Sequence, residues 1–246
     1  YDAVVMPDTN KETLEEDDFI ENIREAVRTN PDIKIWNLSI GYDVLEVQDS
    51  SFSDLAVALD AIKEEFGEIF CKAGGNCHNF ETGRPVGRVT IPAESLLSIT
   101  VGSVSNDDTP SCFSRIGPGS ANTIKPELVS YGGGYVKHNG RLLLDGVKSF
   151  SPDGQVYESA GTSYSTPRIA ALLSSLQNEI REEYNPLLIK ALAIHSANYP
   201  KDIKLEQEER VRYMGYGIPA PIKDILFNSD HEITVIQSDR LMKGKF

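Results

Sequence analysis

The spacing of apolar residues along the chain alternates between a period typical of strands and a period typical of helices. Residues 1–7 form a short apolar run, and residues 14–29 place apolar side chains on one helical face. A strand pattern follows at 33–40, a helical pattern at 52–66 and another strand pattern at 69–73. Because parallel strands are joined by helical crossovers, this order predicts an α/β fold, a mostly parallel sheet between two layers of helices. Ligands of such sheets bind at the carboxyl ends of the strands, so site residues are expected directly after them.

The middle of the chain predicts one further strand, a loop and a small insertion. Residues 98–104 are an apolar strand pattern, whereas 117–134 is dense in Gly and Pro and predicts a loop. Residues 135–160 predict short antiparallel strands, because an Asn-Gly pair at 139–140 and an Asp-Gly pair at 153–154 are typical hairpin turns. We interpret this stretch as a β-rich surface insertion at about 135–160.

The last part of the chain is predicted to be helical. Apolar residues recur at helical spacing from Thr162 onwards, and Pro186 predicts the start of a second helix. We therefore expect one domain over 1–230. Residues 231–246 are expected to begin a following segment, in which 232–236 alternates like a strand and both chain ends look truncated.

Composition excludes several classes of protein. A chain of 246 residues with 40% apolar and 25% charged residues is typical of one globular domain. The net charge of −13 argues against a nucleic-acid partner, since phosphate binding needs clustered Lys and Arg. No run reaches the roughly 18 apolar residues of a membrane span.

The cysteines give information about the cellular compartment and about metal binding. Three of them, Cys71, Cys77 and Cys112, cannot complete a disulfide framework, so reduced thiols and a cytoplasmic location are favoured. The alternative, a secreted protein, would require a signal peptide before Tyr1. Cys71, Cys77 and His78 lack the paired spacing of a zinc site, so no metal is expected. No cofactor is expected either.

Ser163 is the first candidate for site chemistry. It lies in GTSYSTPRIA, and Pro167 cannot donate to the carbonyl four residues back, which is that of Ser163. Ser163 is therefore expected at the helix N-terminus, where unpaired N–H groups and the positive end of the dipole stabilise an oxyanion. A plain Ser/Thr helix cap is the alternative interpretation.

Asn76 is the second candidate. In CKAGGNCHNF, the small residues Ala73, Gly74 and Gly75 follow an apolar strand and place Asn76 at its carboxyl end. Its side-chain amide is a neutral donor suited to a developing oxyanion. The alternative is an ordinary tight turn with a left-handed Asn.

Taken together and in order, these segments resemble the subtilisin-like (S8) peptidase family. GTSYSTP resembles the serine box of the family, WNLSIG resembles its INMSLG strand, and KAGGN resembles AAGN. Further along the chain, IPAESLLSITVGSV, CFSRIGP, IKPELVSYGG and GYGIP resemble four more family segments. Seven matches in family order over nearly the whole chain form a specific signal.

The resemblance implies a serine endopeptidase that acts on proteins or peptides. Ser163 would attack the scissile carbonyl, and Asn76 with the Ser163 backbone N–H would form the oxyanion hole. One wall of the pocket for the residue before the scissile bond would be Ser39, Ile40 and Gly41, and the other Ala73, Gly74 and Gly75. An extended substrate would pair with the first wall through main-chain hydrogen bonds.

The sequence departs from the family pattern in one respect. The family order is Asp, His, Ser, with both earlier residues before the strand that WNLSIG resembles. No matching His precedes Trp36, Asp8 aligns better with a later family strand, and His195 is expected to be an ordinary helix residue. A Ser without a base is a weak nucleophile, so the chain alone is expected to be inactive. Either it is a fragment whose partner is the missing N-terminal part of the same protein, or it is a catalytically silent domain that binds peptides or partner proteins.

Overall fold

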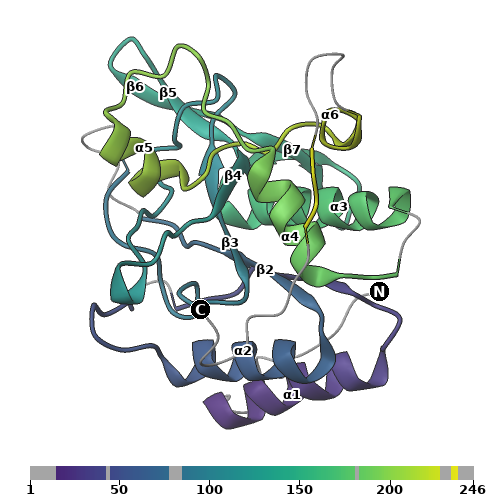
Figure 1. Ribbon diagram of the computed structural model, residues 1–246. Helices are drawn as coiled ribbons and strands as arrows, with labels where there is room; N and C mark the ends of the chain where they lie inside the picture. The colour runs from purple at the N-terminus through teal and green to yellow at the C-terminus, as the bar shows by residue number, and fades with distance from the viewer. Residues whose placement is uncertain (1–14, 43–44, 78–84, 181–182, 228–233, 238–246) are drawn as a thin grey trace.

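A four-stranded parallel sheet lies at the centre of the computed structural model, which describes residues 15–42, 45–77, 85–180, 183–227 and 234–237. The strand order is β1-β2-β3-β4 (Figure 1). The strands are β1 (Ile35–Leu38), β2 (Ile69–Ala73), β3 (Ile99–Val104) and β4 (Leu128–Tyr131). Helices α1 (Glu16–Thr29) and α2 (Asp54–Phe66) cover one face, and α3 (Thr162–Glu179) and α4 (Pro186–His195) cover the other (Figure 1). The predicted α/β fold with helices on both sheet faces is confirmed.

Each sheet face has its own apolar core. Phe70 of β2 packs with α1 and α2, whereas the adjacent Cys71 packs with α3 and α4. This alternation follows from the period of two in a strand, and it assigns Lys72 to the same sheet face as Phe70. The register pairs Leu38 with Lys72, and Lys72 with Thr100. A charged residue therefore occupies an inner strand of the sheet, between Leu38 of β1 and Thr100 of β3.

The helix ends follow local sequence signals. The Ser53 hydroxyl accepts the Ala56 N–H (3.2 Å) at the start of α2, and Gly67 ends that helix with a left-handed backbone, φ +82°. Pro186 is the first residue of α4, as predicted, and the side chain of Asn185 caps the helix.

Two predictions about strands were wrong. The Gly- and Pro-rich stretch 117–134 is not only loop, because it contains β4, whose apolar Leu128 and Val129 are fully buried beside β3. The burial of these two apolar side chains against the sheet outweighed the preference of the flanking Gly and Pro residues for turns. At the other end, 234–237 lie outside any strand, so the described part of the 232–236 prediction is not met. The predictions for residues 1–7, Asp8 and His78 fall outside the described residues.

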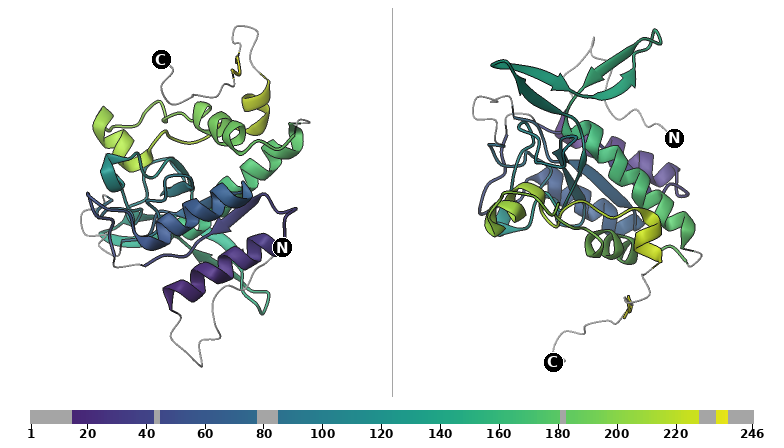
Figure 2. Two further views of the ribbon diagram at one scale, coloured as in Figure 1. Left: turned by 60° about the horizontal axis from the view of Figure 1, so that its bottom comes forward. Right: turned by 90° about the horizontal axis from the view of Figure 1, so that it is seen from above.

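The predicted β-rich insertion consists of two hairpins. Strands β5 (Gly134–His138) and β6 (Arg141–Asp145) form one, and β7 (Val147–Phe150) and β8 (Val156–Ser159) form the other. They project from the body of the fold (Figure 2, right). The remaining elements are the 3-10 turn η1 (Ser120–Asn122) and helices α5 (Gln207–Met214) and α6 (Ile222–Leu226). Within the described ranges, none of the helices has the length and apolar character needed to cross a membrane.

Candidate active site

Ser163 lies in the first turn of α3, beyond the carboxyl ends of the sheet strands. Its side chain is exposed, whereas the preceding Thr162 is buried. The N–H of Gly161 donates to the carbonyl of Gly132, just after β4 (2.9 Å), and this bond ties the start of α3 to the sheet. The helix N-terminus thus presents its positive end where Ser163 is exposed.

The carbonyl of Ser163 is released from the helix by Pro167. Proline has no N–H to donate to it, so this carbonyl lacks its usual partner four residues on. The hydroxyl of Ser39 approaches the same oxygen at 3.5 Å, the outer limit of a hydrogen bond. Ser39 and Ser163, 124 residues apart in sequence, therefore lie side by side.

Asn76 follows β2 and contacts the residue next to Ser163. Its side-chain Oδ1 accepts from the Thr162 N–H (2.9 Å) and from the Thr162 hydroxyl (3.1 Å). A backbone N–H can only donate, so the amide atom facing Thr162 must be oxygen and the NH₂ group lies on the other side. The Asn76 carbonyl accepts from the Arg115 Nε (3.0 Å), which holds the backbone in place.

A narrow crevice lies between these segments. Of the eight site residues that the sequence predicts, seven line it, namely Ser39, Ile40, Gly41, Ala73, Gly75, Asn76 and Ser163. Gly74 is not among the lining residues, and its backbone is hydrogen-bonded to neighbouring segments. Its N–H donates to the Val101 carbonyl (2.9 Å), and its carbonyl accepts from the Thr90 N–H (3.2 Å).

Three residues that sequence reasoning missed also line the crevice, and they are Lys72, Thr90 and Thr162. Thr90 approaches Gly75 so closely that a Cβ on Gly75 would lie 2.5 Å from its Oγ1. Gly75 also has φ +99°, which side chains of L residues rarely adopt. Both observations require glycine at this point of the crevice.

Lys72 is the unexpected charge at this site. It is only 1% exposed, and burial lowers its pKa to about 7, while the carboxylate of Glu94 opposes the shift. The signal that could have identified it is a lysine inside the buried run IFCKA. A charge in a central strand is costly, so it needs a reason.

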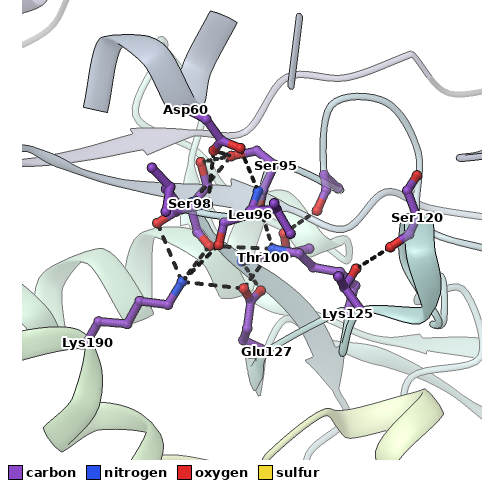
Figure 3. A network of polar contacts seen from close by, with 12 residues as sticks. Asp60, Ser95, Leu96, Ser98, Thr100, Ser120, Lys125, Glu127 and Lys190 are labelled. Carbon is purple, nitrogen blue, oxygen red and sulfur yellow. Dashed lines mark hydrogen bonds and ion pairs between the residues drawn. The ribbon is translucent and has the colours of Figure 1, made fainter. Parts of the chain in front are cut away.

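A polar network fixes the segment that carries Glu94 (Figure 3). The carboxylate of Asp60 accepts from the backbone N–H groups of Leu96 and Leu97, both at 2.9 Å. Lys125 donates to the Ser95 carbonyl (2.6 Å) and to Glu127 (2.7 Å). The turn at 92–98 is therefore attached to α2 and to the segment just before β4.

A second, more apolar pocket adjoins the crevice. Its volume is about 180 Å³, and Ile40 and Gly41 line both spaces. Phe19, Leu38, Leu55 and Pro92 give it apolar walls, and the Tyr42 hydroxyl donates to Glu16 (3.0 Å) at this pocket. It offers room for an apolar side chain beside the predicted substrate wall.

The described histidines lie elsewhere. His138 is in a hairpin, His195 ends α4, and neither is among the residues that line the crevice. In the described part of the chain, no three or more His, Cys, Asp or Glu residues are grouped so that they could hold a metal ion. Cys71, Cys77 and Cys112 are all in the reduced thiol form.

Comparisons with known proteins agree with this arrangement. The chain is 27% identical over 199 residues to the serine protease AprX of Bacillus subtilis, covering 75% of this chain and 43% of AprX. It is 27% identical over 201 residues to the uncharacterized protein y4bN of Sinorhizobium fredii, covering 65% of this chain and 44% of y4bN. The chain thus spans less than half the length of these curated relatives.

Solved structures share the fold. The prenylagaramide maturation protease PagA superposes with a TM-score of 0.64 at 23% identity, covering 90% of this chain and 70% of PagA. The epidermin leader peptide processing serine protease EpiP of Staphylococcus aureus gives a TM-score of 0.64 at 19% identity, covering 91% and 57%. The family model of the subtilases, peptidase family S8, matches residues 1–217. The chain therefore belongs to the subtilase family.

Proposed function

We propose that this chain provides the nucleophile and the oxyanion hole of a serine endopeptidase. The observation that carries the proposal is that Ser163 and Asn76, far apart in sequence, line one crevice at the N-terminus of α3. Ser163 Oγ attacks the scissile carbonyl of a protein or peptide substrate and forms an acyl-enzyme. Membership of the subtilase family and the relationship to a serine protease support this reaction class.

Two hydrogen-bond donors stabilise the oxyanion. The Asn76 NH₂ group donates one hydrogen bond, because its Oδ1 is already occupied by Thr162. The backbone N–H of Ser163, in the first turn of α3, donates the other. Both donors are held before the reaction starts, so they need no reorganisation when charge develops on the oxygen.

The substrate lies extended between two backbone walls. Ser39, Ile40 and Gly41 pair with its main chain, and Ala73 and Gly75 form the opposite wall of the pocket for the side chain that precedes the scissile bond. Gly74 supports the second wall through its bonds to Val101 and Thr90.

The general base and its orienting Asp are proposed to come from residues outside this chain. No family-type His box precedes Trp36, and neither described His lines the crevice. On this proposal, the 246-residue chain alone is expected to be inactive and the complete protein active. The same observation favours a second candidate, a catalytically silent subtilase domain that binds peptides or partner proteins.

Labelling with a fluorophosphonate probe separates the two candidates. The complete protein should label at Ser163 and hydrolyse casein, and Ser163→Ala should lose both while keeping its circular dichroism spectrum, because the side chain is exposed. Loss of a nucleophile costs about six orders of magnitude in turnover, a figure taken from subtilisin, a member of this family. A complete protein that neither labels nor hydrolyses, yet binds peptides, would support the silent domain instead.

A further inference from the structure

Lys72 lines the crevice, and its amine lies close to Gly41. A Cβ placed on Gly41 would lie 3.4 Å from the Lys72 Nζ and 3.5 Å from the Thr90 Oγ1. Gly41, Lys72 and Thr90 all line the crevice, together with the exposed Ser163. A substrate side chain that enters between the two walls therefore approaches the amine of Lys72.

The amine is a buried charge with an incomplete environment. Glu94, the carboxylate whose charge acts on Lys72, influences it as a nearby charge and not through a hydrogen bond. One oxygen of Glu94 accepts the Ser53 N–H (3.0 Å), and its other oxygen is buried without a hydrogen-bond partner. A buried ammonium is stable only when paired and hydrogen-bonded, so a further acceptor at the crevice would stabilise it.

A structural ion pair between Lys72 and Glu94 is the simpler interpretation. The network of Figure 3 shows what such a pair looks like in this protein, since Lys125 donates directly to Glu127 at 2.7 Å and to a backbone carbonyl at 2.6 Å. Lys72 and Glu94 make no such direct bond among the described residues. The crevice-lining position of Lys72 is better explained by a ligand that supplies the missing acceptor.

We infer that Lys72 selects substrates with an acidic side chain, Asp or Glu, at the residue that precedes the scissile bond. This inference rests on the proposed peptidase function and specifies its substrate class. The substrate carboxylate accepts a charge-assisted hydrogen bond from Lys72 Nζ, and the hydroxyl of Thr90 lies beside it as a further donor. An amide of the same shape offers the ammonium no charged acceptor, and a cationic side chain is repelled.

The test uses the full-length protein and peptides that differ only at this residue, as Glu, Gln, Asp or Asn. We expect kcat/KM for each acid to exceed that for its amide by about 10- to 100-fold, the value of a hydrogen bond to a charged group. Lys72→Met should bring the ratio to about 1 or below, and Lys72→Arg should retain it. Equal rates for acid and amide in the wild type, or an unchanged ratio in Lys72→Met, would overturn the inference.

A second variant keeps the test valid if Lys72→Met does not fold. Glu94→Gln removes the competing carboxylate, but it also removes the charge that favours the ammonium form of Lys72. The acid-to-amide ratio should therefore rise at about pH 5.5, where the lysine is protonated, and its decline with rising pH should begin at a lower pH than in the wild type. A ratio at about pH 5.5 that falls below the wild-type value contradicts the inference, because Glu94 would then be part of the acid site rather than its competitor.

Binding to full-length Ser163→Ala separates this inference from the proposed function. Calorimetry should show tighter binding of the Glu peptide than of the Gln peptide, and the difference should vanish in Ser163→Ala/Lys72→Met. Lys72-dependent binding without turnover of any peptide would refute the peptidase and retain the recognition. Turnover without any preference for an acid would refute the recognition and retain the peptidase.

Discussion

The backbone N–H of Thr162 donates a 2.9 Å hydrogen bond to the side-chain Oδ1 of Asn76. This bond joins the segment after β2 to the first residue of α3, across 86 positions of sequence. It also determines the orientation of the Asn76 amide, since only oxygen can accept from a backbone N–H. The donor side of the amide is thereby directed away from Thr162, and the first prediction follows from this orientation.

Asn76→Ala in the complete protein should lower kcat and leave KM nearly unchanged. The lost donor acts on the charge of the transition state and not on the bound substrate. The expected loss is about 100- to 1000-fold, the range measured for the Asn donor of subtilisin, another member of this family. Steady-state kinetics with one peptide substrate give both constants.

Asn76→Asp is the matched control for this prediction. It retains an acceptor for the Thr162 N–H, so it should fold like the wild type, but it replaces the NH₂ donor with a negative charge. A low kcat with an unchanged melting temperature identifies the oxyanion role. Near-normal kcat in Asn76→Ala, with a reduced melting temperature, would identify Asn76 as a turn residue instead.

The isolated 246-residue chain should not react with a fluorophosphonate probe if, as proposed, the general base of Ser163 lies outside this chain. Mass spectrometry of the intact chain after labelling is the measurement, with the complete protein as the positive control. Stoichiometric labelling at Ser163 would show that a histidine within the chain is the base, and His78→Ala and His195→Ala would then be the variants to compare.

The preference for an acidic substrate residue should decrease as pH rises through about 7. Burial lowers the pKa of Lys72 to about 7 against the opposing charge of Glu94, so the free enzyme carries the ammonium below this pH and loses it above. Because kcat/KM reports the free enzyme, the Glu-to-Gln ratio should be high at about pH 6 and approach 1 at about pH 9. The substrate carboxylate, with an ordinary pKa of about 4.3, stays ionised throughout.

The titration of the catalytic base changes kcat/KM equally for the Glu and the Gln peptide. It therefore cancels in the Glu-to-Gln ratio. Lys72→Arg is the control, since its guanidinium stays charged and the ratio should remain high at about pH 9. A wild-type ratio that is independent of pH over this range contradicts the assignment of the titration to Lys72.

Glu127→Gln should destabilise the fold by about 3–5 kcal/mol, because it leaves the buried ammonium of Lys125 without its counter-charge. Urea unfolding followed by circular dichroism measures the free energy of unfolding. Glu158→Gln is the matched control, because Glu158 pairs at 3.8 Å with the largely exposed Lys148 and an exposed pair contributes only about 0–1 kcal/mol. Equal losses in the two variants would show that the network of Figure 3 does not stabilise the turn at 92–98 as described.

The sequence by itself determined the structural features that depend on residues close together in the chain. Gly67 ends α2 because glycine adopts the left-handed backbone of a helix C-terminus without strain. Pro186 starts α4 because the first residue of a helix needs no backbone N–H donor. Pro167 placed Ser163 in the first turn of its helix by the same kind of steric argument. The seven motifs in order identified the subtilase family from residues spread over the chain, without any knowledge of their contacts.

The tertiary structure decided which of these residues meet and which charges they bury. The stretch around Leu128 has the composition of a loop, and only its burial beside β3 makes it a strand. Gly74 and Gly75 are indistinguishable in sequence, but one uses its backbone within the sheet and the other faces Thr90 in the crevice. In the sequence, Lys72 is only a lysine within an apolar run. The sheet register and the positions of Gly41 and Thr90 place its amine at the crevice. Long-range packing set these outcomes, and no local pattern encodes which distant backbone a side chain will face.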